Sequence, residues 1–537
     1  MNTTANPYDL NPYSSYPYPV SHPNNLAVIA TIFGLSPVAL DHCRVLEIGC
    51  ASGENLLPIA ATFPKAQLVG LDYSKVQISK AQQAQKELGL SNIQFLCEDL
   101  CEVDLTKLGR FDYVIAHGIY SWLPPQAQSA LLKLCRTCLT ENGVAYVSYN
   151  TLPGWHMRKS LREFMLFHAS SFGDGPPDVS QARALLDFMA NNMPVENNLV
   201  GQYLRSEIEQ LINEEGFSAL AHDYLEQNNE PIYFSEFIAR AQLEDLDYLG
   251  EAEFFSMLGV GIAPDAKVKL SNEIKDIVRL EQYYDFMTNR SFRMTLMVPK
   301  GTPLQRNITA DRMASLWVSA VGLASGFTPS AKTLSSNKVM RYQVGGENSP
   351  YLDASAPITK AALGVLGKFF PANLHFEELL KLAREHLSTD HNTKISLLED
   401  RNTLGMELLI AYSVKLLKLS TTSNQALPIL DLKDRSKNIL VSEHNRYQAA
   451  TANFLTNLNH EKVTLDEGAL QIVSLLDGKH DELALKQAFY ELIRNEVLVL
   501  KTEKGKKIMP KVDSPEVSGL LNGTLENLAK ALLLTKN

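Results

Sequence analysis

The chain has 537 residues, of which 45% are hydrophobic and 20% are charged. These values are typical of a folded globular protein, and the length suits roughly three or four domains. The formal net charge of −10 argues against sequence-independent binding to phosphate backbones, which requires a basic surface.

The sequence has no run of about 18 uncharged apolar residues, and residues 1–26 lack the charged start and apolar core of a secretory signal. We therefore expect a cytoplasmic protein without membrane insertion. All six cysteines lie in the first 138 residues, which is not the pattern of a disulfide framework. Cys135 and Cys138 fall in a helical apolar pattern, so buried thiols are favoured over a zinc site and no metal is expected.

Residues 1–26 are rich in Asn, Pro, Ser and Tyr, and they are predicted to be irregular. Their tyrosines are unusual for a disordered segment, so a segment folded over a binding site and a free tail are both open. After a predicted helix at 27–34, apolar strands alternate with amphipathic helices, and this alternation predicts a parallel, doubly wound α/β sheet. Strands are expected at 44–48, 67–71, 93–97, 111–116 and 143–149, with helices at 53–62, 74–88 and 125–139.

Residues 156–230 are mostly helical and are predicted to form an insertion into this fold. A helix at 234–243 and strands at 248–255 and 292–298 are expected to close the sheet. Beyond residue 300, helices alternate with strand-like segments, which predicts two winged-helix-like α+β domains. The predicted domains are therefore 1–155 together with 231–300, a helical insertion at 156–230, a middle domain at 301–435 and a C-terminal domain at 436–537. Within the last two domains, helices are expected at 358–370, 376–385, 404–417, 464–476 and 482–495, a linker at 419–440, and a hairpin at 497–502 and 507–512.

The most informative segment is residues 45–53 (VLEIGCASG), which is followed by a second apolar run that ends in Asp72. An apolar run that leads into an acid and a small-residue loop indicates a buried strand turning into a helix. Such a unit presents backbone N–H groups and a helix N-terminus to a ligand, and an acid after the next strand can hold a ribose.

This spacing resembles the first motif of class I methyltransferases, which bind S-adenosylmethionine (AdoMet). The resemblance implies a Rossmann-like methyltransferase sheet that ends with a sixth strand and an antiparallel seventh. It also implies AdoMet as the cofactor and S-adenosylhomocysteine (AdoHcy) as the product. Glu47 is then expected beside the amino-acid end of the cofactor, and Asp72 is expected to accept both ribose hydroxyls. Ala51 stands where many members have a glycine.

Polar and aromatic residues follow the fourth and fifth strands, where this family places the transferable methyl group. Residues 116–124 (AHGIYSWLP) lack the Asn/Asp-Pro-Pro-Tyr/Phe motif of enzymes that methylate nucleobase amino groups or glutamine amides, which disfavours those substrates. His117 is predicted to act as a general base or to shape the pocket, and a structural histidine is the alternative. Residues 147–155 (VSYNTLPGW) suggest recognition rather than packing. The predicted catalytic residues are His117, Tyr120, Tyr149 and Asn150, and Trp122 and Trp155 are predicted to line the substrate pocket.

A narrower resemblance covers most of the chain. Residues 18–23 (YPVSHP), the two loops above, residues 455–461 (LTNLNHE) and residues 475–478 (LLDG) resemble bacterial methyltransferases that carry a methyltransferase regulatory domain, here near 215–300. This group includes rickettsial protein-lysine methyltransferases that modify outer-membrane proteins. In this family an acid after the third strand commonly binds the adenine amino group, which favours Asp99 over Glu98. The residues expected to bind the cofactor are Tyr18, His22, Glu47, Gly49, Ala51, Gly53, Asp72, Tyr73, Asp99, Leu100 and His117.

The resemblance implies an AdoMet-dependent methyltransferase that acts on protein lysine side chains. Small-molecule or lipid methylation is one alternative, and a non-catalytic AdoMet-sensing regulatory protein is another. The expected partner is a protein substrate rather than nucleic acid, and a homodimer is left open. For a lysine substrate, a pocket built by Tyr18, Tyr120, Trp122 and Tyr149 would favour the neutral amine, with His117 or water taking the proton.

Overall fold

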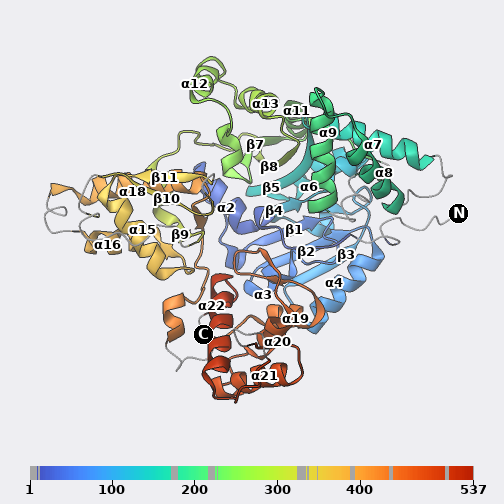
Figure 1. Cartoon of the computed structure of the whole chain (residues 1–537). Helices are drawn as coiled ribbons and strands as arrows, with labels where there is room; N and C mark the ends of the chain where they lie inside the picture. Colours follow the sequence, from blue (N-terminus) through green and yellow to red (C-terminus); the bar gives the residue numbers. More distant parts are fainter. Residues whose placement is uncertain are drawn as a thin grey trace.

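A computed structural model describes the chain at residues 9, 13–170, 179–215, 224–226, 228–322, 334, 338–346, 349–387, 394–433, 439–501 and 507–535. Figure 1 shows a large α/β unit around a central sheet, with two smaller units formed by the later part of the chain beside it. No helix in these described ranges is long and apolar enough to cross a membrane.

The central sheet has the strand order β3-β2-β1-β4-β5-β8-β7, and the short strand β6 also pairs with β5. Strands β1 to β5 run parallel, whereas β8 is antiparallel to both of its neighbours, β5 and β7. The predicted fold class is confirmed, with β7 as the sixth strand of the family pattern and β8 as the antiparallel seventh. The strands are β1 (Arg44–Ile48), β2 (Gln67–Asp72), β3 (Ile93–Cys97), β4 (Phe111–Ala116), β5 (Leu139–Leu152), β6 (Ile232–Tyr233), β7 (Leu246–Glu251) and β8 (Phe292–Pro299).

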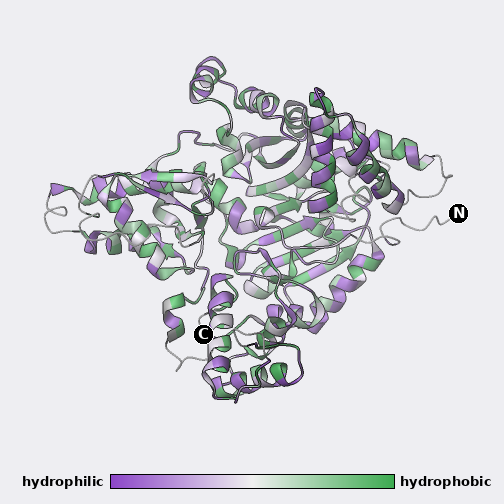
Figure 2. Ribbon diagram, in the orientation of Figure 1, coloured by the Kyte–Doolittle hydropathy of each residue, from purple (hydrophilic) through white to green (hydrophobic). Residues whose placement is uncertain are grey.

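Helices cover both faces of this sheet because successive strand residues point to opposite sides. Val45 packs in one apolar cluster with α2, α3 and α4, whereas Leu46 packs in a second cluster with α6 and α11. Figure 2 shows the strands between these layers as largely hydrophobic. The helices are α2 (Pro23–Ile32), α3 (Leu57–Thr62), α4 (Lys75–Glu87), α5 (Leu105–Leu108), α6 (Pro125–Cys138) and α11 (Phe234–Leu243).

Two of these helices begin at positions that differ from the predicted ones, for local reasons. The helix predicted at 27–34 is α2, which starts earlier because Pro23 occupies its first turn and the ring of His22 accepts a hydrogen bond from the N–H of Asn24. The helix predicted at 53–62 starts only at Leu57, because residues 51–56 form turns. Cys135 and Cys138 are free and buried in α6, as expected.

The segment predicted as an insertion is helical in its described residues. It lies between β5 and β6, and α13 then leads into β8. In Figure 1, α7, α8 and α9 gather at the same end of the large unit. The helices of this part are α7 (Trp155–Ser170), α8 (Val179–Asn192), α9 (Leu199–Gln210), α12 (Pro264–Glu273) and α13 (Ile277–Thr288).

In its described residues, the middle unit contains a three-stranded antiparallel sheet, a separate hairpin and three α-helices. The helix predicted at 404–417 begins seven residues earlier, because Ser396 and Glu399 form a reciprocal capping box. Leu419 and Ser420, predicted to belong to a linker, lie in β13 and pair with β9. The elements are β9 (Trp317–Ala320), β10 (Met340–Gln343), β11 (Tyr351–Ala354), α15 (Pro357–Phe369), β12 (Leu374–His375), α16 (Phe376–Glu385), α18 (Leu397–Ser413) and β13 (Leu417–Ser420).

The C-terminal unit packs its own apolar core and adjoins α3 of the large unit (Figure 1). The predicted hairpin is reduced, in the described residues, to an isolated bridge between Lys501 and Lys507. A long helix, α22, was not predicted, and its buried Leu521, Leu525 and Leu528 complete the core. The elements are α19 (Glu443–Thr451), β14 (Leu455–Thr456), β15 (Lys462–Val463), α20 (Glu467–Leu475), α21 (Glu482–Arg494) and α22 (Pro515–Lys530).

Candidate active site

A cavity of about 720 Å³ opens at the carboxyl ends of β1, β2, β4 and β5. This edge of an open parallel sheet is where α/β folds bind ligands. Twelve of the residues predicted for the site line the cavity, and they come from both the cofactor and the substrate predictions. They are Tyr18, Glu47, Gly49, Ala51, Asp72, Tyr73, Leu100, His117, Trp122, Tyr149, Asn150 and Trp155.

Glu47 is a buried carboxyl group on β1, and its side chain is only partly satisfied. Its Oε1 accepts a hydrogen bond of 2.7 Å from Nδ2 of Asn55. Its Oε2 has no hydrogen-bond partner among the described residues. Burial raises the pKa of Glu47 to about 8. A cationic group in the cavity would pair with this oxygen and favour the ionised carboxylate.

Asp72 joins the loops that follow β1 and β2. Its Oδ2 accepts from the backbone N–H of Ala51 and its Oδ1 from that of Ser74, each at 2.8 Å. Ala51 has φ +47°, a conformation that suits glycine and costs other residues on the order of 1 kcal/mol. The bond from Asp72 holds Ala51 in this conformation, which explains how the chain accommodates the departure from the family motif.

Gly49 allows the loop after β1 to pass close to Ile119 in the loop after β4. Its φ is +75°, and a Cβ atom built there would lie 2.6 Å from Cγ2 of Ile119. A side chain at this position would therefore displace the loop after β4. The glycine keeps the backbone of the motif open to a ligand.

The described part of the N-terminal segment lies over the cavity, in agreement with the first of the two alternatives. Tyr13, Ser14, Ser15 and Tyr18 all line the cavity. The backbone carbonyl of Tyr13 accepts a hydrogen bond of 2.8 Å from the side chain of Gln77 on α4. Residues 1–8 and 10–12 lie outside the described residues.

His117 is held by its neighbours in a neutral state. Its Nδ1 lies 2.7 Å from the hydroxyl of Tyr146 and 3.4 Å from that of Ser148. The ring of Tyr18 packs against it with 3.9 Å between ring centroids. Burial lowers the pKa of His117 to about 4, so the imidazole is uncharged at neutral pH.

Tyr149 presents its ring to the cavity, while its hydroxyl belongs to a buried polar chain. The hydroxyl lies 3.0 Å from Oγ1 of Thr295, and Oγ1 donates a 3.0 Å hydrogen bond to Oε1 of Glu251. Because Thr295 uses its proton on the carboxylate, the Tyr149 hydroxyl is the donor to Thr295. The proton of the Tyr149 hydroxyl is therefore engaged by Thr295.

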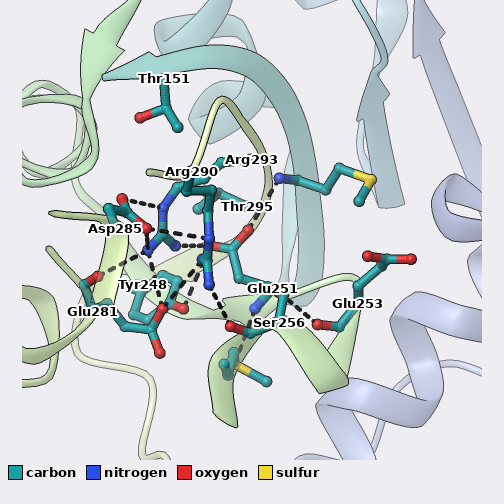
Figure 3. A network of polar contacts seen from close by, with 12 residues as sticks. Thr151, Tyr248, Glu251, Glu253, Ser256, Glu281, Asp285, Arg290, Arg293 and Thr295 are labelled. Carbon is teal, nitrogen blue, oxygen red and sulfur yellow. Dashed lines mark hydrogen bonds and ion pairs between the residues drawn. The ribbon is translucent and has the colours of Figure 1, made fainter. Parts of the chain in front are cut away.

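The hydrogen bonds from Tyr149 through Thr295 to Glu251 lead into an ion-pair network around Arg293 of β8 (Figure 3). The buried guanidinium donates to Glu251 at 2.6 Å, to Asp285 at 2.8 Å and to Glu281 at 3.0 Å. Arg290 also pairs with Asp285, at 3.2 Å. Two cations thus face three carboxylates, and burial raises the pKa of Glu281 to about 7.

The insertion forms the outer wall of the cavity. Trp155 at the start of α7 packs against Tyr224, with 5.7 Å between ring centroids. Arg158, one turn further along α7, lines the cavity and pairs with Glu207 of α9 at 2.7 Å. Asn150 lies beneath this wall, where its backbone N–H donates to Oγ of Ser121 at 2.9 Å.

Four predicted residues do not line the cavity. His22 caps α2, and Asp99 accepts from the backbone of Cys101. Tyr120 packs in the core against Tyr149 and Phe237. A side chain at Gly53 would lie 2.6 Å from the ring of Phe95, so this glycine serves close packing. Of the acid pair after β3, Glu98 lines the cavity and Asp99 does not.

Several residues of the site were missed by sequence reasoning. Asn55, Ser121, Arg158 and Tyr224 line the cavity, and Tyr146 holds His117. The position of Asn55 just after the motif was visible in the sequence, but nothing in the sequence indicated that its amide would bond Glu47. Within the described residues, no group of three or more His, Cys, Asp and Glu residues could hold a metal ion.

Known proteins resemble this chain both in single domains and over almost its whole length. Three family models match the chain: "Methyltransferase domain" over residues 45–143, "Predicted methyltransferase regulatory domain" over 217–299, and "PKMT, C-terminal winged helix domain" over 440–533. An uncharacterized protein of Rickettsia prowazekii (strain Madrid E) is 32% identical over 98% of this chain and 94% of its own length. The solved structure of PKMT2 from Rickettsia typhi is 29% identical, covers 98% of this chain and 100% of its own, and has a TM-score of 0.85. The same protein in complex with AdoHcy is 29% identical, covers 97% of this chain and 100% of its own, and has a TM-score of 0.83.

The sheet order, the cavity at its carboxyl edge and these matches define a class I AdoMet-dependent methyltransferase, with AdoMet as its cofactor. The chain belongs to the family of these enzymes that carry a methyltransferase regulatory domain and a PKMT-type C-terminal winged helix. The resemblance inferred from the sequence motifs is confirmed.

Proposed function

We propose that the protein transfers methyl groups from AdoMet to lysine side chains of protein substrates. The observation that carries this proposal is the match along almost the entire chain to PKMT2 of Rickettsia typhi, where PKMT stands for protein lysine methyltransferase. That match includes the insertion, the middle unit and the C-terminal unit as well as the AdoMet fold. A small-molecule methyltransferase would share only the sheet and its first motif.

We also propose the domain division that the sequence predicts. Residues 1–155 and 231–300 form the AdoMet-binding domain, with a helical insertion at 156–230. Residues 301–435 and 436–537 form the middle and C-terminal domains. Each of the three larger units has an apolar cluster built mainly from its own residues, which supports this division. Val28 and Ile32 also join the cluster of the middle unit, and Leu427 and Leu432 join that of the C-terminal unit.

The residues around the cavity fit the cofactor by their chemistry. Glu47, one of whose buried oxygens finds no partner within the described ranges, would hold the α-ammonium group, and Asp72 would accept the ribose hydroxyls. Glu98 and Leu100, which also line the cavity, would contact the adenine end. When bound, AdoMet supplies an electrophilic methyl group on its sulfonium.

The chain's own residues would prepare a lysine as a neutral nucleophile. A free lysine has a pKa near 10.4, and a desolvated, aromatic site lowers that value. Trp122, Tyr149 and Trp155 provide apolar surface on the substrate side of the cavity. Tyr18, which packs on His117, and the described part of the N-terminal segment also line the cavity and would exclude water from it.

In this proposal His117 orients the site, and water accepts the proton. Burial raises the pKa of Tyr146, so its hydroxyl keeps its proton. When that hydroxyl donates to Nδ1 of His117, the imidazole proton sits on Nε2, and this tautomer offers no free lone pair to a substrate. Tyr149 acts through its ring, because its hydroxyl is bonded to Thr295.

The partner that we propose is a protein substrate, which the enzyme methylates in the cytoplasm. The net charge of −10 disfavours nucleic acid. A homodimer stays a prediction, and sedimentation of the purified chain over a range of concentrations tests it.

The test is to incubate the purified protein with methyl-labelled AdoMet and fractionated host lysate, including membranes. We expect label in protease-sensitive, alkali-stable bands, and methyl-lysine after acid hydrolysis. Asp72→Ala should abolish the label because it removes the proposed ribose ligand, whereas Asp353→Ala, which removes an exposed carboxylate paired with Arg341, should leave it unchanged.

If the label extracts into organic solvent or appears in small molecules, the substrate is a lipid or a small molecule rather than a protein lysine. AdoMet binding without any transfer to the lysate would favour the sensing function.

A further inference from the structure

Asn55 makes four hydrogen bonds, and they connect three distant parts of the chain. Its Nδ2 donates to Oε1 of Glu47 at 2.7 Å and to Oγ of Ser21 at 3.1 Å. Its Oδ1 accepts from the backbone N–H of Tyr18 at 2.8 Å. The same oxygen lies 2.8 Å from Nε2 of His460, which belongs to the C-terminal unit. Every donor and lone pair of this amide is therefore engaged.

These partners fix the orientation of the amide. The N–H of Tyr18 can only donate, so the oxygen of Asn55 must face it, and the Nδ2 group must face Glu47. Because that oxygen can only accept, Nε2 of His460 carries the proton. Burial lowers the pKa of His460, so the ring stays neutral and in this tautomer.

His460 is presented by a tightly built turn between β14 and β15. Its φ of +61° is uncommon for a residue other than glycine. Its backbone N–H donates to the carbonyl of Asn457, and the Asn457 side chain accepts from the N–H groups of Asn459 and Glu461. His460 is 5% exposed and packs against His22, with 4.8 Å between ring centroids. The motif at 455–461, for which the cofactor chemistry gives no role, thus builds the turn that presents His460.

The surrounding interface holds the turn against the AdoMet loop. Gln448 of α19 donates to Glu54, the neighbour of Asn55, at 3.1 Å. Phe454 packs on Tyr16 of the N-terminal segment, with 5.4 Å between ring centroids. The C-terminal unit therefore docks on the loop that follows β1, and β1 carries Glu47, the proposed ligand of the cofactor's amino-acid end.

We propose that His460 is a positioning residue for AdoMet, and that the C-terminal unit uses it to set the affinity for the amino-acid end of the cofactor. His460 holds Asn55, Asn55 holds one oxygen of Glu47, and the other oxygen stays directed to the ligand. This inference rests on the proposed placement of Glu47 at the cofactor's ammonium group. It assigns the C-terminal unit a direct part in cofactor binding.

The test compares two ligands on the full-length protein by calorimetry. AdoHcy has the amino-acid end, whereas 5′-methylthioadenosine lacks it. His460→Ala removes the donor to Asn55 and should raise the Kd for AdoHcy about tenfold, while the Kd for methylthioadenosine changes less than about twofold. His460→Gln, which restores an N–H donor of similar reach, should recover most of the AdoHcy affinity.

His444→Ala is the matched control. This histidine is equally buried in the same unit, and neither of its ring nitrogens has a hydrogen-bond partner among the described residues. It should leave the ratio of the two Kd values unchanged. An equal loss for both ligands in His460→Ala would reduce His460 to a structural residue and overturn the proposal.

Glu47→Gln separates this inference from the proposed site. If that variant weakens AdoHcy but not methylthioadenosine, Glu47 is correctly placed, and an unaltered AdoHcy affinity in His460→Ala then refutes the link alone. If Glu47→Gln leaves AdoHcy binding unchanged, the placement of Glu47 is wrong and the inference falls with it.

Discussion

Glu47, the proposed ligand of the cofactor's ammonium group, makes the stability of the ligand-free protein depend on pH. Its carboxyl group is buried, one oxygen has no hydrogen-bond partner in the part of the chain that the structure describes, and burial raises its pKa from 4.5 to about 8. Between these two values the native state binds more protons than the unfolded chain. The free energy of unfolding therefore falls as the pH rises through this window, by up to about 1.4 kcal/mol per pH unit for one group.

We predict that Glu47→Gln removes this part of the pH dependence. Without ligand, the variant should lose less stability than the wild type between pH 5 and pH 8, because glutamine does not ionise. Urea unfolding at both pH values measures the difference. Glu281 contributes in the same direction in both proteins, so the comparison isolates Glu47. Equal losses in the two proteins would show that Glu47 ionises freely in the native state.

At this scale, the sequence predicted the residues whose role depends on local spacing. Glu47, Gly49 and Asp72 follow from a strand–loop–helix pattern, because that pattern fixes where backbone and carboxylates meet. Asn55 and His460 could not be predicted, because their contact joins positions 405 residues apart and depends on how two units dock. Tyr120 was predicted to be catalytic, but only the packed structure shows it in the core.

Among the elements, β8 carries two residues of the buried polar network, Arg293 and Thr295. Arg293 on this strand is fully buried, and it compensates carboxylates from β7 and α13. Two residues later on the same strand, Thr295 joins this network to Tyr149. The antiparallel strand thus supports the wall of the cavity from behind.

We predict that Arg293→Met costs about 3–5 kcal/mol of folding free energy, because it leaves buried carboxylates without their cation. Arg341→Met is the matched control, since Arg341 forms an exposed pair with Asp353 and such pairs contribute less than about 1 kcal/mol. Thermal unfolding of the two variants at pH 8 provides the measurement. At pH 5.5 the cost of Arg293→Met should shrink, because Glu281, with its pKa near 7, is then protonated. Similar midpoints for both variants would contradict this account.

Secondary structure was predictable where the hydrophobic period is long and regular. The alternation from β1 to β5 and the helix α16 were predicted within a few residues or better, since both have a clearly buried side. The strand β13 was missed because it has only four residues and polar residues follow it. The start of α18 was also missed, because a capping box rather than an apolar residue defines it.

At the scale of the molecule, the N-terminal segment contacts every large unit. Tyr18 bonds Asn55, and His22 packs on His460. Oδ1 of Asn24 accepts from the N–H and hydroxyl of Thr421, just after β13 in the middle unit, at 2.8 and 2.9 Å. How the units assemble was not predictable, because these contacts come from single side chains in loops and at the ends of helices and strands.

We predict that Asn24→Ala loosens the middle unit from the AdoMet-binding unit. It leaves the N–H of Thr421 without its acceptor, which costs about 1–3 kcal/mol. The first thermal transition should fall by about 2–4 °C for each kcal/mol. Thr421→Val, which removes only the hydroxyl and keeps the N–H bonded, should have a smaller effect. An unchanged first transition in Asn24→Ala would mean that the hydrogen bond between Asn24 and Thr421 contributes little to holding the two units together.

The link between Asn55 and His460 also has a consequence for biosynthesis. A ribosome adds roughly 5–20 residues per second, so about 20–80 s pass between the synthesis of Asn55 and that of His460. During this interval the residues of the sheet and of its first motif have already been synthesised, but His460, the last donor to the Asn55 amide, has not. A polypeptide released before that point carries the whole AdoMet motif and lacks the contact that completes it.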